Sequence, residues 1–273
     1  TTIFFLNKMK IKQDGVFDIK GKFDNPLTGK PYQNLYSVDE LEIKGQKVPA
    51  TYQRYAEIVH SQPLMDKKHS HEILEMLKNN RVLVIESATG TGKTVILPKL
   101  AAHFVNYKKL VAITVPKTSL AKSSGGFCAR CMDVRLGDEV GFAHRDSKII
   151  EDTFDENGDP VKIERESYNR EKTKLLFCTD GWLASSVSND LTFSKFGVIM
   201  MDEIHERNSN MDLLLLYLRE ALLINPDLRV IVTSATLNIN KFVDYFKSKG
   251  ISVASKSVSK DTQYKVNVIH ENI

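Results

Sequence analysis

Residues 82–94 read VLVIESATGTGKT, and this stretch decides the fold of the chain. Its first four residues, Val82 to Ile85, form a short apolar run that is typical of a strand buried on both faces of a sheet. A Gly-rich loop follows, and the loop leads into a segment with a helical pattern. Strand, loop and helix in this order are the context of a phosphate-binding loop. The stretch therefore predicts an α/β domain with a phosphate site at the end of a strand.

The loop supplies three kinds of phosphate contact. Gly90 and Gly92 let the backbone bend so that successive amides point at phosphate oxygens at the positive end of a helix. Lys93 would neutralise the charge of the β- and γ-phosphates, and Thr94 would offer its hydroxyl to Mg²⁺. Ser87 stands where the pattern G-x-x-x-x-G-K-[ST] has its first Gly. The residues that we assign to the nucleotide are Thr89, Gly90, Thr91, Gly92, Lys93 and Thr94.

Four further apolar runs repeat the strand pattern. They are residues 110–114, 175–178, 198–201 and 230–232, and each precedes a segment that can be helical. Strands that alternate with helical stretches imply a parallel sheet with helices on its faces. The longest strongly apolar run, residues 211–224, carries charged residues and is shorter than the roughly 20 residues that span a bilayer. We therefore expect an α/β fold with no membrane segment.

The chain divides into two predicted regions. Residues 1–69 have an irregular pattern, so we expect a small N-terminal appendage of unknown role, with a strand candidate at residues 15–19 and a helix from Val48 to His60. Residues 70–273 have a regular pattern and predict the phosphate-binding domain. Its end would contain one helix and two strand-like pieces, at residues 241–247, 251–254 and 264–269.

A polar insertion near residues 147–172 interrupts the regular pattern. It contains the turn signal Glu156-Asn157-Gly158-Asp159-Pro160. An Asn-Gly step between short extended stretches favours a β-hairpin, whereas the density of charge is equally typical of a mobile surface loop. Both interpretations stay open from the sequence.

The composition excludes several classes of protein. The 273 residues are 42% hydrophobic and 26% charged, which is typical of a globular chain and not of a disordered or low-complexity one. The formal net charge of +4 permits an anionic partner without requiring one. Three cysteines cannot all pair, so we expect an intracellular protein. Cys128 and Cys131 form a lone C-x-x-C, which we interpret as structural because no second pair accompanies it.

Two adjacent acids follow the apolar run at residues 198–201. Carboxylates at the C-terminal end of a parallel strand face the ligand crevice of such sheets. Asp202 can hold hydrated Mg²⁺ there, and Glu203 can orient and deprotonate an attacking water. We therefore assign catalysis to Lys93, Asp202 and Glu203, and Mg²⁺ binding to Thr94, Asp202 and Glu203. A third run ends in Ser234-Ala235-Thr236, which by itself is more typical of a cap for a helix over residues 237–247 than of a catalytic motif.

Three motifs, in this order, resemble motifs I, II and III of superfamily 2 helicases. They are residues 89–94, the Asp-Glu-Ile-His at 202–205 and the Ser-Ala-Thr at 234–236. The DEAH-box branch fits best, because shorter words of that branch recur at residues 72–75, 140–142, 145, 179–181 and 205–207. The resemblance covers about residues 70–270 and implies a P-loop NTPase with a RecA-like parallel sheet.

The resemblance also implies roles for residues outside the nucleotide loop. Residues 114–117 resemble motif Ia and residues 179–181 motif Ib, which contact the nucleic-acid backbone in the family; Lys117 stands where Arg is usual. The assigned contact residues are Pro116, Lys117, Arg145, Thr179, Asp180 and Gly181. Backbone contacts do not read base sequence, so binding would be sequence-tolerant. Pro116 as a helix start and Asp180 as a helix cap remain alternatives.

His205, Ser234 and Thr236 would couple the nucleotide state to movement between lobes. No Gln-based adenine-reading motif precedes the phosphate loop, so we expect ATP as the nucleotide with other NTPs accepted. No Gln-Arg-x-Gly-Arg motif occurs either. We therefore expect the first motor lobe of a longer ATP-dependent RNA helicase, whose second RecA-like lobe supplies the arginine fingers.

An arginine finger contributes roughly 10³ to 10⁵ in rate, so this lobe alone would hydrolyse NTP weakly and not unwind. RNA is favoured over DNA by the resemblance. The alternatives are a DNA helicase or translocase of the same superfamily and an NTP-dependent clamp or assembly subunit that does not hydrolyse. The intact Lys93, Asp202 and Glu203 argue against the clamp.

Overall fold

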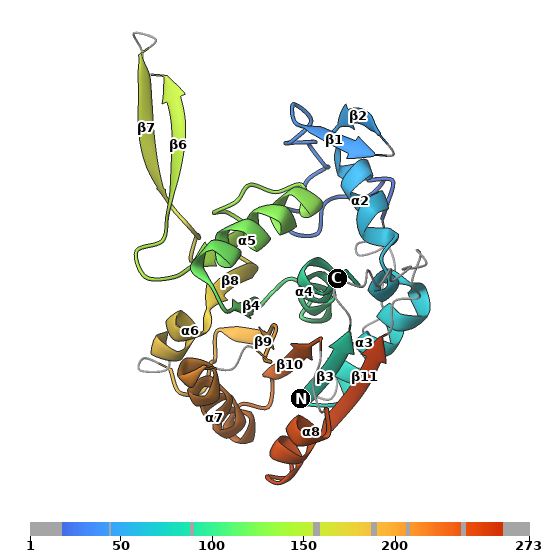
Figure 1. The fold of residues 1–273 in the computed structure, drawn as a ribbon, viewed down its shortest axis with the longest axis vertical. Helices are drawn as coiled ribbons and strands as arrows, with labels where there is room; N and C mark the ends of the chain where they lie inside the picture. The colour runs from blue at the N-terminus through green and yellow to red at the C-terminus, as the bar shows by residue number, and fades with distance from the viewer. Residues whose placement is uncertain are drawn as a thin grey trace, which may run out of the picture.

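A seven-stranded parallel sheet forms the centre of the molecule (Figure 1). The computed structural model describes residues 18–43, 45–87, 90–154, 159–186, 190–205, 208–235 and 239–258. In spatial order the strands are β11 (Val253–Val258), β3 (Val82–Ser87), β10 (Arg229–Ser234), β9 (Phe196–Met201), β4 (Leu110–Val115), β8 (Leu175–Thr179) and β5 (Val140–Ala143). Every neighbouring pair is parallel, which confirms the predicted RecA-like α/β fold.

Helices cover both faces of the sheet. The first face packs against α2 (Tyr52–His60), α3 (Lys67–Asn79), α4 (Lys93–Phe104) and α5 (Thr118–Met132), and the second against α6 (Asp180–Ser186), α7 (Ser209–Ile224) and α8 (Ile239–Lys247). Successive strand residues alternate between the two cores: Leu83 and Ile85 join the first, Val82 and Val84 the second. This double burial explains the continuous apolar runs. Within the described ranges, no helix has the length and apolar character needed to cross a bilayer.

The predicted strands agree with the structure except at the sheet's outer edges. All five apolar runs are strands, each with one to three additional residues. The edge strand β5 was not predicted as a strand because Gly141 interrupts its apolar run. At the other edge, β11 begins at Val253 rather than at residue 251 and runs to Val258. The strand predicted at residues 264–269 lies outside the described residues.

The N-terminal region contains a small hairpin, β1 (Glu40–Ile43) and β2 (Gln46–Pro49), and the short 3₁₀ turn η1 (Pro63–Met65) follows α2. The helix predicted from Val48 was wrong in its first part. Val48 pairs with Leu41 in the hairpin, because the residue before a proline is disfavoured in helical conformation. Residues 18–19 of the predicted strand at 15–19 are not in a strand, and the rest lies outside the described residues. The domain boundary near residue 69 stays a prediction.

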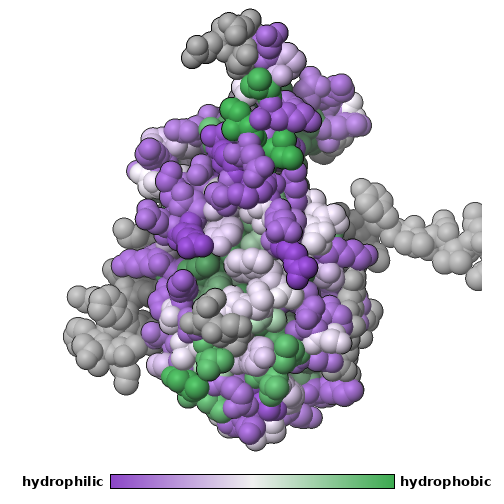
Figure 2. All heavy atoms as spheres, turned by 90° about the vertical axis from the view of Figure 1, so that its left-hand side faces the viewer, coloured by the Kyte–Doolittle hydropathy of each residue, from purple (hydrophilic) through white to green (hydrophobic). Residues whose placement is uncertain are grey.

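The polar insertion is a hairpin, so the structure decides between the two interpretations. Strands β6 (Lys148–Phe154) and β7 (Pro160–Glu166) pair antiparallel and project from the body beside α5 (Figure 1). Figure 2 shows this side of the molecule as mostly hydrophilic, with hydrophobic groups gathered near the hairpin and at the opposite end of the molecule. The large exposed apolar side chains of the hairpin are Ile150 and Ile163.

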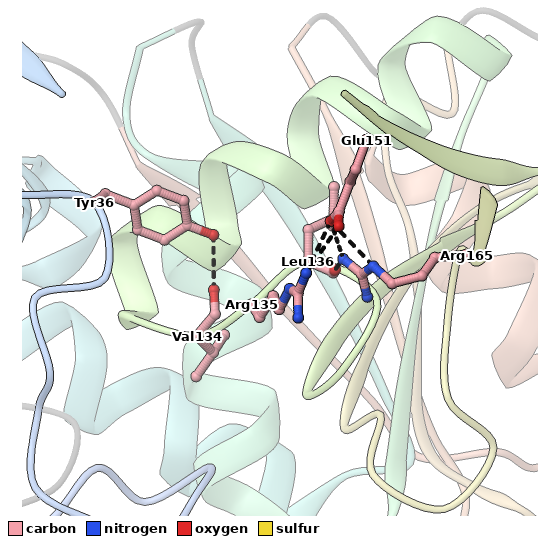
Figure 3. Close-up of polar contacts among 6 residues, drawn as sticks. All are labelled: Tyr36, Val134, Arg135, Leu136, Glu151 and Arg165. Atoms are coloured by element: carbon pink, nitrogen blue, oxygen red, sulfur yellow. Dashed lines mark hydrogen bonds and ion pairs between the residues drawn. The ribbon is translucent and has the colours of Figure 1, made fainter. Parts of the chain in front are cut away.

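Glu151, in the middle of β6, lies between two arginines (Figure 3). Its carboxylate lies 2.8 Å from the Arg135 guanidinium and 2.7 Å from that of Arg165. Arg165 also donates to the backbone oxygen of Leu136 at 2.9 Å. The hairpin is therefore held by side-chain contacts to the loop that follows α5.

Candidate active site

The phosphate loop joins β3 to α4 through two glycines in left-handed conformation. Gly90 has φ 78° and Gly92 has φ 92°, a region that other L-residues rarely adopt. A Cβ on Gly92 would also lie 2.4 Å from the Ile96 Cδ1 atom, so the Ile96 side chain would have to shift to accept a larger residue. Thr91 donates to the Ser87 hydroxyl at 3.2 Å, and Ser87 is therefore part of the loop's internal bonding. Thr89 lies outside the described residues.

Lys93 is held at the start of α4 by partners on both sides of the loop. Its ammonium donates to the Ser87 carbonyl at 3.0 Å and lies 3.1 Å from a Glu203 carboxylate oxygen. Its side chain is only 5% exposed. A buried ammonium is costly unless it is paired, and Glu203 supplies the compensating charge. The structure thus brings together the loop lysine and one of the two predicted catalytic acids.

Asp202 follows β9 and is buried beside β10. One carboxylate oxygen accepts hydrogen bonds from the Thr233 hydroxyl and, at 3.1 Å, from the backbone N–H of Glu203. Burial raises the pKa of Asp202, and the negative charge of Glu203 acts in the same direction, while the Thr233 bond and Lys93 oppose the rise. An added cation near this carboxylate would favour its ionised form.

The Glu203 side chain links Lys93 to His205. The residue has φ 50°, a strained conformation for a non-glycine residue. Its second carboxylate oxygen lies 3.2 Å from the His205 Nδ1 atom, and that nitrogen is 3.3 Å from the Ser234 hydroxyl oxygen. The predicted coupling residues His205 and Ser234 therefore lie close to the predicted catalytic acid Glu203, whereas Thr236 lies outside the described residues.

The predicted nucleic-acid residues follow the carboxyl ends of the strands at the other half of the same sheet edge. Pro116 and Lys117 come between β4 and α5, Arg145 comes two residues after β5, and Thr179 ends β8. Parallel strands share one carboxyl edge, so all these positions lie on the side of the sheet that carries the phosphate loop. Lys117 and Arg145 are exposed, as contacts to a polymer require.

Asp180 has a structural role that the sequence left as an alternative. It is 4% exposed, and it accepts from the Gly181 N–H at 2.9 Å and from the Asn208 amide at 2.6 Å. It therefore ties the start of α6 to the residue that caps α7. Its contact with nucleic acid stays a prediction.

A pocket of about 430 Å³ adjoins the phosphate loop. Beyond the loop and Glu203, it is lined by residues from the end of α2 and from the exposed face of α5, including Ile58, Val59, Gln62, Ser123 and Phe127. Sequence reasoning missed this set. No local pattern marks these residues, because they come together only when α2 packs against α5 and η1 packs against α4.

The model of a protein family described as "DEAD/DEAH box helicase" matches residues 67–244 of the chain. The chain belongs to this helicase family. The helicase motifs that it carries as residues 202–205 and 234–236 fall within the matched range.

Three relatives of this helicase domain are named as RNA helicases. "Putative ATP-dependent RNA helicase L540" of Acanthamoeba polyphaga mimivirus is 34% identical over 236 residues, which cover 86% of this chain and 29% of the relative. "ATP-dependent RNA helicase HrpA" of Borreliella burgdorferi is 32% identical over 183 residues, which cover 66% of this chain and 20% of the relative. The Escherichia coli HrpA is 28% identical over 228 residues, which cover 83% of this chain and 16% of the relative. The matched region thus spans less than a third of each relative.

The oxygen donors of the helicase domain fit Mg²⁺. Thr94 lines the pocket, and Asp202 presents a buried carboxylate after β9, which β10 separates from β3 in the sheet. Within the described residues no group of three or more His, Cys, Asp or Glu side chains could hold a metal by itself. Mg²⁺ is commonly held by one or two carboxylates together with substrate phosphates, so this donor set fits an ion that arrives with a nucleotide.

The three cysteines are all buried and free. Cys128 and Cys131 lie on α5, and both belong to the core on the first face of the sheet. Burial raises the pKa of Cys131 to about 12 and shifts that of Cys128 in the same direction, so both thiols are protonated at neutral pH.

Proposed function

We propose that this helicase domain binds ATP, or another NTP, with Mg²⁺ and serves as the first motor lobe of an RNA helicase. The 3.1 Å contact between Lys93 and Glu203 carries the proposal. The contact joins the lysine of the phosphate loop to an acid that follows a separate strand, so a phosphate bound at this loop would lie near both groups.

Nucleotide binding would change the partners of Lys93. The amides around Gly92 would receive the phosphates, and the Lys93 ammonium would move from Glu203 to the β- and γ-oxygens. Glu203, released from that ion pair, would become a free carboxylate base at the γ-phosphate. Thr94 and Asp202 would hold Mg²⁺, which supplies positive charge to the triphosphate when it is bound.

Glu203 would then accept a proton from a water molecule as the water oxygen bonds to the γ-phosphorus. The bond from this phosphorus to the oxygen bridging the β- and γ-phosphates breaks, and ADP leaves with that oxygen. His205 would sense the change, because it lies between Glu203 and Ser234. Ser234 ends β10, and Thr236 follows two residues later, so these groups would pass the nucleotide state toward the second lobe.

RNA would lie along the half of the sheet edge that carries Lys117 and Arg145. The names of the relatives favour RNA over DNA. The second RecA-like lobe would supply the arginine fingers, so the 273-residue chain alone would turn over weakly.

The test is steady-state NTP hydrolysis by the full-length protein, with and without single-stranded RNA or DNA. Glu203→Gln removes the base but keeps the side chain's size, and Glu151→Gln is the matched control at the hairpin. We expect RNA-stimulated hydrolysis that falls by about 10² to 10⁴ in Glu203→Gln only. Stimulation by DNA alone would favour the translocase. Tight NTP binding without hydrolysis in the full-length protein would overturn the proposal of a motor lobe and favour the clamp or assembly subunit that does not hydrolyse.

A further inference from the structure

Tyr168 and Trp182 form an aromatic pair at the outer end of the central sheet. Their ring centroids are 5.9 Å apart, and the rings make an angle of 81°. Trp182 lies in the first turn of α6, and Tyr168 follows β7 by two residues. Both residues are only partly buried, and they pack against the core on the second face of the sheet. The proposed function uses neither of them.

A second aromatic pair on the same face shows what a purely structural contact looks like. Phe193 and Phe196 meet edge-on with ring centroids 6.0 Å apart, and they are 1% and 7% exposed. Packing alone explains such a closed pair. Trp182 differs, because the next residues of α6, Leu183 and Ala184, are buried while Trp182 keeps part of its surface in solvent. That part of the indole is available to a ligand.

Trp182 has a fixed place beside the carboxyl edge of the sheet. Its backbone N–H donates to the Thr179 hydroxyl at 3.4 Å, and Thr179 ends β8. Asp180, which lies between them in the sequence, accepts from the Asn208 amide at 2.6 Å. The indole is therefore within one helical turn of the edge on which we place the RNA.

Tyr168 lies beside the last strand of the sheet. The Phe142 N–H in β5 donates to the Ser167 carbonyl at 3.0 Å, which brings the segment after β7 alongside β5. A Cβ on Gly141 would lie 2.5 Å from the Tyr168 Cβ atom, so the glycine leaves room for the tyrosine there. The edge-on contact with Tyr168 restricts the orientation of the indole. A ring that is already oriented loses little freedom when a ligand stacks on it.

The predicted backbone contacts lead toward this pair. Strands β4, β8 and β5 are consecutive in the sheet, and Lys117, Thr179 and Arg145 lie at or beyond their ends in that order. Neighbouring strands are about 5 Å apart, so a polymer that crosses the three ends leaves the sheet beside β5. The aromatic pair lies at that end of the path. Contacts to the backbone leave the bases of a single strand able to stack on a ring.

We propose that Trp182 stacks on one base of the single-stranded RNA, and that Tyr168 is a positioning residue that holds the indole. This inference rests on the proposed function, because it takes the RNA backbone to lie across the ends of β4, β8 and β5. Every base has an aromatic face, so the contact adds affinity without reading sequence. It gives a base contact to an edge whose other predicted residues contact the backbone.

Trp182 is the only tryptophan of the 273-residue chain, so the tryptophan fluorescence of this chain reports the contact directly. The chain is titrated with a single-stranded uridine oligomer, and with an oligomer of the same length whose nucleotides are abasic. The anisotropy of a dye on each oligomer measures the affinity separately. We expect the uridine oligomer to quench the emission in parallel with its binding, and the abasic oligomer to bind more weakly and without quenching.

Variants separate stacking from a general structural role. Trp182→Ala should weaken binding of the uridine oligomer about tenfold and leave binding of the abasic oligomer unchanged, whereas Trp182→Phe keeps a ring and should lose less. Tyr168→Ala should weaken the uridine oligomer by less than Trp182→Ala does, and Tyr168→Phe should bind as the unchanged chain does. Tyr245→Ala is the matched control, because Tyr245 is a partly buried aromatic residue that packs on the same core from α8.

Two results would contradict the stacking contact: binding of the uridine oligomer without quenching, or an equal loss for both oligomers in Trp182→Ala. The quenching experiment needs no variant, so it tests the inference even if Trp182→Ala does not fold. Failure of the unchanged chain to bind either oligomer would instead overturn the proposed nucleic-acid edge, and the stacking contact with it. The two failures are therefore distinguishable.

Discussion

Two glutamates in this protein contact cations at short distance, yet their surroundings differ. Glu203 lies at the end of a central strand, where its partner Lys93 is 5% exposed. Glu151 lies on the projecting hairpin between Arg135, whose side chain is 56% exposed, and Arg165 at 25%. Hydrogen bonds from Arg165, and secondarily Arg135, lower the pKa of Glu151. Its contacts hold a surface element in place.

The difference shows how burial decides what an ion pair does. At the hairpin, water screens the charges, so the ion pairs orient the side chains but contribute little to stability. At the phosphate loop, the ammonium is out of water and depends on a partner, so it is ready to exchange Glu203 for phosphate. Lys99, on the same helix as Lys93, provides a third case. It is 4% exposed, and none of the described carboxylates forms an ion pair with it.

The largest effect on stability is expected at Lys99. Burial lowers its pKa from 10.5 to about 8, with the nearby Cys131, Cys128 and Asp18 opposing the shift. The folded state therefore binds fewer protons than the unfolded state between about pH 8 and 10.5, and its stability rises across that window. Below pH 8 the full penalty, about 3 kcal/mol, is present.

Lys99→Met should therefore increase the free energy of unfolding by about that amount at pH 7, and by clearly less at pH 10. Urea unfolding of both proteins at the two pH values measures the difference. Titration of the cysteines in the unfolded chain is common to both proteins and cancels. A gain of the same size at both pH values would show that the Lys99 charge is not the cause.

The next effect is expected at Lys93. Lys93→Met would lower the affinity for ATP and tripolyphosphate alike, by roughly tenfold to hundredfold, because a charge-assisted contact to phosphate is lost. Equilibrium binding in the presence of Mg²⁺ measures it, with Glu151→Gln as the control. Unchanged tripolyphosphate affinity would contradict the exchange of Glu203 for phosphate.

The smallest effect is expected at the hairpin. Glu151→Gln should reduce the free energy of unfolding by less than about 1 kcal/mol, because exposed ion pairs contribute little. Since the folded pKa of Glu151 is lowered, its contribution is present above pH 4.5 and is lost as the pH falls through the folded pKa. Urea unfolding at pH 7 and pH 3 tests this, and amide exchange of β6 and β7 should increase at pH 7. A loss of several kcal/mol in the free energy of unfolding would contradict this and show that the ion pairs of Glu151 behave as buried ones do.

The sequence predicted the parts of the molecule in which local pattern and burial agree. The central strands are buried on both faces, so each one is a continuous apolar run that can be recognised without its neighbours. The phosphate loop depends on Gly92 because of its own backbone conformation and its contact with Ile96, four residues away. The acids Asp202 and Glu203 follow a strand, and strand ends of a parallel sheet meet at one edge.

Other parts were not predictable because their contacts join distant residues. Val48 was predicted to lie in a helix, whereas in the structure it pairs with Leu41 in a hairpin. The sequence did not decide whether the polar insertion is a hairpin or a loop, because both interpretations had equal support. In the structure, Glu151 contacts Arg165 and Arg135, which lie 14 and 16 positions away in the sequence. Asp133 receives hydrogen bonds from residues about 100 positions earlier.

The sequence by itself determined the fold class, the order of the helicase motifs and the identity of the residues at the phosphate loop. Their physical basis is local, since strand burial, glycine conformation and the position of acids after a strand are read within a few residues. Only the tertiary structure decided that Lys93 is paired with Glu203, that Asp180 ties α6 to α7, and that Phe127 packs edge-on against Tyr55 of α2. These contacts depend on how separately formed elements pack, which no short stretch of sequence specifies.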